Sequence, residues 1–205
     1  MLPDLLSPAD VGGVVPWRAL CRDGALVPLW NLVAQRATVP TGPALRAGAL
    51  ATVLHGQVVV GGIAAAWVHC GGPPPRRVTA LHKARTHRPW PDPAVQITQA
   101  TLLANEIVDV GGVSVTSVQR TGLDVARDAD TAAALDWLRR LRGVGFEVAS
   151  ARLALERRPR WHGRNRIREV LDAFDADDRG PGHDAALRGG RLRPAAAGSA
   201  PPGHP

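Results

Sequence analysis

The spacing of apolar and polar residues in the N-terminal part of the chain predicts two short helices and a strand. Ser7 followed by Pro8 is typical of a helix start, because serine caps the first turn and proline fits its backbone. A second short helix is predicted over Pro16–Arg22, and Asp23-Gly24 ends it. The apolar residues of Ala25–Trp30 then favour a strand. These are parts of a winged helix-turn-helix, although a complete one has a further helix.

Helical and strand-like patterns alternate through the middle of the chain. Apolar residues recur at helical spacing over Ala44–Leu54, and Ile63–His69 predicts a second, buried helix. The apolar run Val58–Val60 before it fits either a strand or the lead-in to that helix. The glycine pair Gly111-Gly112 lies between two valine-rich pieces and predicts a hairpin. In all, four β-like pieces are predicted, at residues 78–81, 95–101, 106–110 and 113–116.

The pattern becomes helical again at Ser117. Asp130–Leu141 gives the clearest helix, because aspartate at its start and arginine at its end favour the helix dipole. Two further helices are predicted over Phe146–Glu156 and Asn165–Phe174. After Asp175 the chain consists mainly of glycine, proline, alanine and arginine, which have little to bury, so the remainder is predicted to be disordered.

Together these patterns predict an α+β fold that is mainly helical. We expect a partial, truncated winged helix over residues 1–34, a mixed α/β core with a small antiparallel sheet over residues 35–175, and a disordered tail over residues 176–205. The length of 205 residues suits one domain of ordinary size with small attachments.

The charge of the chain is compatible with nucleic-acid binding but does not establish it. The formal net charge is +7, and a basic protein is attracted to nucleic acids and anionic surfaces. Of 25 cationic residues only Lys83 is a lysine. This preference for arginine, with much alanine, glycine and proline, is also what a GC-rich genome produces without selection for binding. Both explanations stay open.

The sequence contains no recognised catalytic or metal-binding motif. It has no Gly-x-Ser-x-Gly elbow, no Walker loop and no His-Glu-x-x-His motif. Cys21 and Cys70 lack partners at zinc-finger spacing. We therefore expect a protein that is not an enzyme and holds no metal or cofactor. The N-terminus does not resemble a signal peptide and no apolar run could span a bilayer, so we expect a cytoplasmic protein without a membrane partner.

Two groups of arginines are candidates for DNA contact. Arg18 and Arg22 lie about one turn apart on the predicted second helix, where such side chains meet phosphates or guanine edges. The densest basic segment surrounds Trp161 and His162, and an aromatic side chain among arginines suits a nucleic-acid backbone with a stacked base. It equally suits an acidic protein partner or a solvated face. The candidates in this segment are Arg157, Arg158, Arg160 and Arg164.

A third cluster begins the helix after Ser117. Arg120 and Asp124 are four residues apart and can pair on one helix face, with Thr121 beside them. This spacing favours a structural network, and a surface that faces a protein partner is the functional alternative. Trp67 is expected in the core, and His69 is expected to be a hydrogen-bonded structural histidine.

Several of these segments occur in an order and spacing that resemble a known family. Leu20–Leu29 is similar to its wing region and Pro43–Ala51 to the helix that follows. Val60–His69 is similar to a segment of small residues that closes on Ala-Trp-x-His. Val113–Thr116, followed by Arg-Thr-x-x-Asp at residues 120–124, is similar to its strand and next helix. The family is that of the AbiEi-type antitoxins of high-GC, actinobacterial species, and the resemblance covers roughly residues 20–174.

The resemblance implies an antitoxin of a type IV toxin–antitoxin system. Its partner would be a nucleotidyltransferase-type toxin encoded beside it, and Arg120, Thr121 and Asp124 would then face the toxin or support the fold. The winged helix of such antitoxins also binds promoter DNA and makes them transcriptional autoregulators. The chain departs from the family in its short N-terminus and in lacking the nuclease-like C-terminal domain of many relatives. Two alternatives follow, a non-catalytic remnant of a restriction-endonuclease-like protein and a basic nucleic-acid-binding protein without a toxin partner.

Overall fold

The computed structural model describes residues 4–83 and 92–189, with side chains up to residue 177. It is an α+β structure, as the sequence predicts. The α-helices are α1 Val14–Arg22, α2 Pro43–Ala51, α3 Gly62–Cys70, α4 Val118–Asp128, α5 Thr131–Arg142, α6 Val148–Glu156 and α7 Arg164–Gly189. The strands are β1 Leu5–Leu6, β2 Leu26–Trp30, β3 Val33–Arg36, β4 Val59–Gly61, β5 Val78–His82, β6 Val95–Gln99, β7 Ile107–Val110 and β8 Val113–Thr116. Two single-turn 3-10 helices are η1 Pro8–Val11 and η2 Ala104–Glu106.

A small antiparallel sheet covered by α1 forms the N-terminal unit, which we define as residues 4–39. Its strand order is β1-β3-β2. The helix α1 packs on the sheet through Trp17, which forms a small buried cluster with Leu26 and Ala34. The sequence patterns predicted η1, α1 and β2 but not β3, because four residues are too few to show an alternation. This short strand is nevertheless central, with a partner on each side.

The N-terminal unit shares the main hydrophobic core of the protein. Leu29, Trp30 and Val33 are at least nine-tenths buried and belong to the same cluster as the residues of α3 and α4. The indole Nε1 of Trp30 also donates a 2.7 Å hydrogen bond to the carbonyl of Pro75, which precedes β5. The unit is therefore attached by both apolar contact and a buried hydrogen bond.

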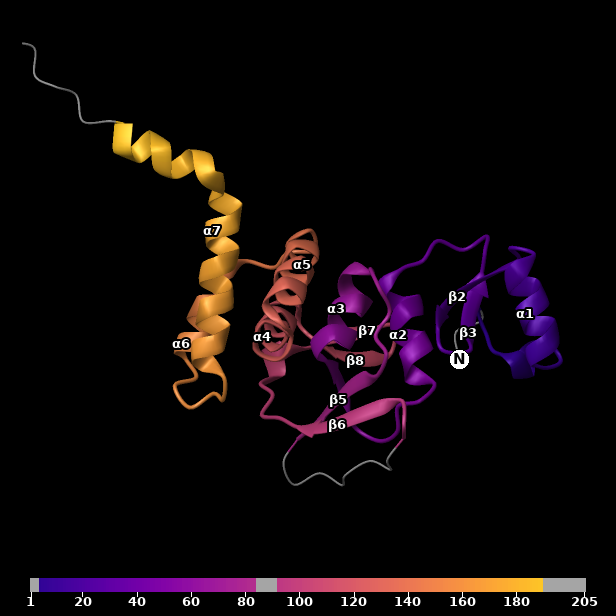
Figure 1. Ribbon diagram of the computed structural model, residues 1–205. Coiled ribbons are helices and arrows are strands. Elements are labelled where there is room, and N and C mark those ends of the chain that lie inside the picture. Colours follow the sequence, from indigo (N-terminus) through magenta and orange to yellow (C-terminus); the bar gives the residue numbers. More distant parts are fainter. Residues whose placement is uncertain (1–3, 84–91, 190–205) are drawn as a thin grey trace, which may run out of the picture.

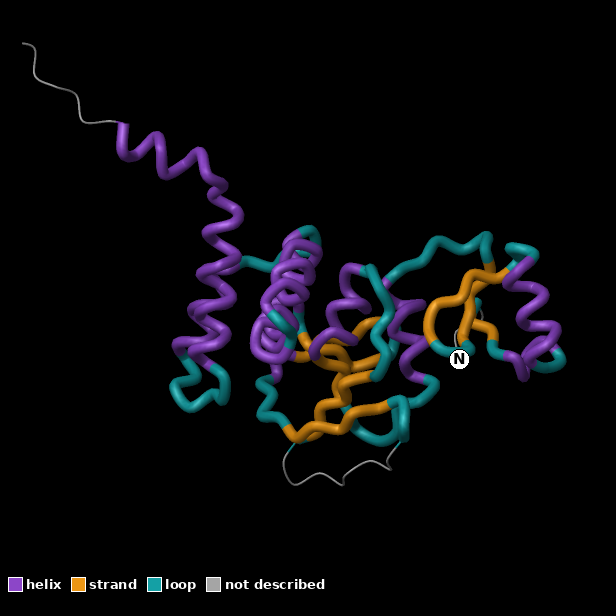
Figure 2. The backbone as a smooth tube through the Cα atoms, in the orientation of Figure 1, coloured by secondary structure: helices purple, strands orange, loops and turns teal. Residues whose placement is uncertain are grey.

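A five-stranded mixed sheet, drawn in orange in Figure 2, forms the centre of the molecule. Its strand order is β6-β5-β4-β8-β7. The β7–β8 hairpin at Gly111-Gly112 is confirmed, and β4 pairs with β5 in antiparallel fashion. The prediction of a small antiparallel sheet in the core is wrong, because the core sheet also contains parallel pairs, β4 with β8 and β5 with β6. The small, purely antiparallel sheet of the protein lies in the N-terminal unit. Strands β4 and β8 each lead directly into a helix, and a helical connection allows parallel pairing.

The helices pack around α3, which is the most apolar of them. Residues Ala64–Val68 are all buried, and Trp67 is only 3% exposed, which confirms its predicted place in the core. Figure 1 shows α4 to α7 gathered on the side of α3 away from the N-terminal unit. The approach of α4 to the loop before α6 is close, because a Cβ atom added at Gly122 would lie 2.2 Å from Cε2 of Phe146. This position requires glycine.

The predicted helix starts at Ser117 and Asp130 are confirmed. The hydroxyl of Ser117 accepts a hydrogen bond from the backbone N–H of Arg120, and the carboxylate of Asp130 accepts one from Ala133 at 2.9 Å. Both side chains satisfy N–H groups that have no partner within the first turn of a helix.

The last helix continues beyond residue 175, where the sequence predicted the tail to begin. Phe174 is buried in the core and anchors α7, and one turn later Asp177 pairs with Arg139 of α5 at 2.8 Å. The helix therefore extends from a docked segment, and it ends at Gly189. Residues 190–205 of the predicted tail lie outside the described residues. None of the helices in the described ranges is long and apolar enough to cross a membrane.

Candidate functional site

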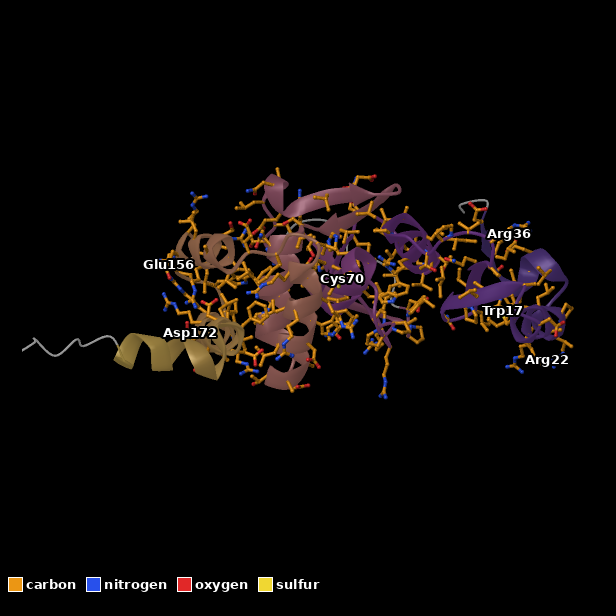
Figure 3. All side chains as sticks on the ribbon, turned by 90° about the horizontal axis from the view of Figure 1, so that it is seen from above. Trp17, Arg22, Arg36, Cys70, Glu156 and Asp172 are labelled. Atoms are coloured by element: carbon orange, nitrogen blue, oxygen red, sulfur yellow. The ribbon has the colours of Figure 1, made fainter. Side chains whose placement is uncertain are left out.

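The predicted DNA-contacting arginines of the N-terminal unit lie on the exposed face of α1. Trp17 points into the sheet, while Arg18 and Arg22 are exposed. The guanidinium of Arg22 is 3.7 Å from the carboxylate of Asp23 in a solvated ion pair, and within residues 4–83 and 92–189 Arg18 has no partner. Figure 3 shows Trp17 between helix and strands, with Arg22 at the outer end of the unit. Both guanidinium groups are accessible to an anionic partner.

The N-terminal unit as a whole carries no excess charge. Its cationic residues, which are Arg18, Arg22 and Arg36, are balanced by Asp4, Asp10 and Asp23. Asp10 is used locally, because its carboxylate accepts hydrogen bonds from the backbone and hydroxyl of Ser7, and these bonds lower its pKa. Any attraction of this unit for DNA must therefore come from the placement of two arginines on one helix face.

The basic segment from Arg157 to Arg164 divides into exposed and inward-facing residues. Arg157 and Arg160 are exposed, and their side chains make no polar contact with other described residues. The side chains of Arg158 and Arg164 are each 16% exposed, and they pair with Glu106 and Glu156 respectively. The segment is therefore not one continuous basic patch, and only half of the predicted DNA-contacting residues in it are free to meet a partner.

Glu106 is the centre of a buried network that the sequence patterns did not predict. Its Oε2 atom accepts hydrogen bonds from Nη1 of Arg120 at 2.9 Å, from Nη2 of Arg158 at 2.6 Å and from the backbone N–H of Leu103 at 2.9 Å. The two arginines also donate to the carbonyl of Thr101, at 3.1 and 3.2 Å. The turn η2 places this carboxylate between α4 and the segment after α6, which lie far apart in the sequence.

A second carboxylate, Asp124, continues the network along α4. Nε of Arg120 donates to its Oδ2 at 3.0 Å, and both side chains are only 2% exposed. Its Oδ1 lies 3.1 Å from Nη1 of Arg127, in an ion pair whose geometry does not make a hydrogen bond. Burial raises the pKa of Asp124, against the lowering influence of both arginines. Arg127 in turn binds Asp128 through two hydrogen bonds of 2.7 and 2.6 Å.

These groups form a charge-balanced arginine–carboxylate network. Each of its three guanidinium groups has at least one carboxylate partner, and its members are Arg120, Arg127, Arg158, Glu106, Asp124 and Asp128. The half-buried ring of Trp161 covers it: the guanidinium carbons of Arg120, Arg158 and Arg127 lie 4.7, 5.0 and 5.9 Å from the ring centroid. The electron-rich face of an indole attracts such cations, so the tryptophan is held in a fixed position.

Thr121, the third residue of the predicted cluster, connects α4 to the end of β8. The hydroxyl of Thr121 donates to the carbonyl of Thr116 at 3.1 Å, and Nε2 of His69 lies 2.7 Å from the same carbonyl. Because a carbonyl only accepts, Nε2 carries the proton, and His69 is a hydrogen-bonded histidine as predicted. Burial lowers the pKa of this histidine. Arg120, Thr121 and Asp124 are all at least 97% buried, so this cluster faces the interior.

A groove of about 1040 Å³ lies beside the network. We call it the arginine groove. Its lining includes Trp161, His162 and the network side chains, together with Arg76 and Arg77, which directly precede β5. Three polar side chains of β5 and β6 also line the groove, namely Thr79, Gln96 and Thr98. Sequence patterns gave no signal for Arg76 and Arg77, since they belong to no dense basic run.

No cluster of three or more His, Cys, Asp or Glu side chains suited to a metal ion occurs within the residues that the structure describes. No protein-family model matches this chain, and a search of curated proteins finds no match. The geometry of these arginines is therefore the main support for a function.

Proposed function

We propose that this protein is an antitoxin of the AbiEi type that binds its own promoter DNA through the N-terminal unit. The observation that carries the DNA-binding part is the exposed pair Arg18 and Arg22 on α1, directly before the β2–β3 hairpin. In helix-turn-helix proteins one helix enters the major groove, and its side chains contact bases and phosphates. The antiparallel sheet in which β1 and β2 both pair with β3 also supports the proposal.

Because the N-terminal unit has no excess charge, we expect the affinity of its DNA contacts to depend only weakly on salt concentration. Each phosphate that a protein neutralises contributes about −0.9 to the slope of log affinity against log salt. Two arginines therefore give a slope of about −2 for the N-terminal contacts. A much steeper slope would mean that binding comes from generic attraction by the whole basic protein.

The test is equilibrium binding of the full chain to its own upstream DNA and to a scrambled duplex, over a series of salt concentrations. We expect a preference of at least about 1000-fold for its own DNA, the low end for specific binders. The double variant Arg18→Ala/Arg22→Ala should lose that preference, and Arg157→Ala/Arg160→Ala removes the same charge elsewhere and should keep it. Weak and equal binding to both duplexes would refute promoter recognition.

Point variants are preferable here to deletion of the N-terminal unit. Leu29, Trp30 and Val33 are part of the main core, so removing residues 1–34 would expose apolar surface and damage the rest of the protein. Loss of binding in such a deletion would not separate DNA contact from unfolding.

The antitoxin part rests on the resemblance described above and on the exposed arginines of the α6–α7 connection. Arg157 and Arg160 are accessible and unpaired in the described structure, so they can meet an acidic surface of a nucleotidyltransferase-type toxin. The test is co-expression with the protein encoded by the adjacent gene. We expect growth arrest by that protein alone, rescue by the wild-type chain and reduced rescue by Arg157→Glu/Arg160→Glu. Arrest without rescue by the wild-type chain would exclude an antitoxin role.

A further inference from the structure

We propose that the arginine groove binds a nucleotide, either free or as part of a single strand, with its phosphate at Arg76 and Arg77 and its base at Trp161. This site is separate from α1 and does not depend on promoter binding.

Among the described residues, the positive charge of the groove that lacks a carboxylate partner lies at Arg76 and Arg77. Among the cations that line it, Arg120, Arg127 and Arg158 are neutralised by the carboxylates of the network. Arg76 and Arg77 are not. Both are exposed; Arg77 donates one hydrogen bond to the carbonyl of Val95 at 3.1 Å, and Arg76 has no partner among the residues described. Both residues line the groove, and guanidinium groups without counter-charge suit phosphate oxygens, which they bind through parallel hydrogen bonds.

The groove is also lined by uncharged polar side chains. In the register of the sheet Thr79 lies opposite Gln96, and Thr98 follows two residues later on the same face of β6. These three side chains line the groove and form no hydrogen bond with other described residues. Hydroxyl and amide groups both donate and accept, so they can pair with sugar hydroxyls and base edges rather than with further phosphates.

Trp161 supplies an aromatic ring to the groove. Its ring lines the groove, is partly exposed and is held by the cations of the network. Aromatic side chains bind nucleotides by stacking on the base, whatever the base is. A ring that is already held loses little conformational freedom on binding, which favours affinity. The groove volume of about 1040 Å³ is at the upper end for small-molecule sites and accommodates such a ligand.

The experiment measures equilibrium binding of the full chain by isothermal titration. The ligands are ATP, the single strand dA6, adenosine and inorganic tripolyphosphate. We expect ATP or dA6 to bind at least about tenfold more tightly than either adenosine or tripolyphosphate, since both base and phosphate are recognised. The tighter of ATP and dA6 identifies the source as a free nucleotide or a single strand.

Two double variants with equal loss of charge locate the site. Arg76→Ala/Arg77→Ala should weaken the better ligand by at least about tenfold, whereas Arg157→Ala/Arg160→Ala should change affinity by less than about threefold. All four arginines are exposed, so both variants are expected to fold, which circular dichroism checks. Trp161→Phe should retain binding and Trp161→Leu should weaken it, because only an aromatic ring stacks.

Three results would overturn the proposal. They are the absence of ATP and dA6 binding, equal binding of tripolyphosphate, and equal losses in the two double variants. The outcome is distinguishable from that of the promoter experiment, because Arg18→Ala/Arg22→Ala should leave ATP and dA6 binding unchanged. Conversely, Arg76→Ala/Arg77→Ala should leave the preference for promoter DNA intact.

Discussion

The arginines of this protein fall into two populations that the linear sequence does not separate. Arg120 is buried, pairs with two carboxylates and lies 4.7 Å from the centre of an indole ring. Arg160 is exposed and contacts none of these groups. Neighbours in the chain differ in the same way, because Arg157 is exposed while Arg158 binds Glu106. The local density of arginine is therefore a poor guide to accessible positive charge.

The two populations of arginine are expected to respond differently to substitution. A buried arginine with carboxylate partners cannot be removed without leaving those carboxylates uncompensated, which is costly. An exposed arginine contributes little to stability and is free to contribute to binding. Stability and binding measurements should therefore respond to different arginines.

The largest expected effect is that of Arg120→Ala. Removing one partner of a buried ion pair costs about 3–5 kcal/mol, and here Glu106 and Asp124 both lose a partner. Urea denaturation should show a loss of that size in the free energy of unfolding. Arg160→Ala is the matched control and should change it by no more than about 0.5 kcal/mol. Similar losses of unfolding free energy in the two variants would contradict the distinction between buried and exposed arginines.

An intermediate effect is expected for Arg46→Ala. Arg46 is 9% exposed and donates to the carbonyl of Val68 at 2.9 and 3.1 Å, and to that of His69 at 3.4 Å. These carbonyls belong to the last turn of α3, where they lack helical partners. A charged hydrogen bond contributes about 1.5–3 kcal/mol, and the loss in unfolding free energy should lie in that range. The exposed Arg36 provides the control, and a loss no greater than that of Arg36→Ala would contradict this role.

The smallest effect concerns His69 and acid. Burial lowers the pKa of this histidine in the folded state below its ordinary value of 6.5. Below that value the unfolded chain binds more protons than the folded protein does. The contribution of His69 to the free energy of unfolding is therefore complete above pH 6.5 and is lost as the pH falls below it. His69→Gln keeps a donor for the carbonyl of Thr116 but does not titrate. The wild-type protein should therefore lose more stability than this variant between about pH 7.5 and about pH 5.5; parallel losses would show that other groups are responsible.

Features of the fold that depend on neighbouring residues could be predicted from the sequence. The caps at Ser117 and Asp130, the hairpin at Gly111-Gly112 and the i,i+4 pair of Arg120 with Asp124 are all local, and the structure contains each of them. Each needs only a short stretch of chain to form. The periodicity of apolar residues likewise located the principal helices of the core.

The pairings that give the candidate sites their shape could not be predicted in this way. The parallel pairing of β4 with β8 joins Val60 to Val115, and nothing local distinguishes it from other arrangements. In the sequence, Glu106 could be predicted only as the start of a strand. Its partners Arg120 and Arg158 are 14 and 52 residues further along the chain, so no local pattern connects them. Arg76 and Arg77 form part of a groove only because β5 and β6 lie beside α4 and Trp161.

The attachment of the N-terminal unit has a bearing on how this protein can be modified by design. A DNA-binding domain that folds independently can be moved from one protein to another. Here Trp30 fills the core of the remaining protein and is tied to Pro75 by a hydrogen bond. Residues 4–39 moved to another scaffold would expose the apolar side chains that pack into the core here. Replacing them with a foreign domain would leave a cavity in the remaining protein. Under the proposed promoter binding, a change of DNA target is therefore better sought by substituting residues on the outer face of α1 than by exchanging the whole unit.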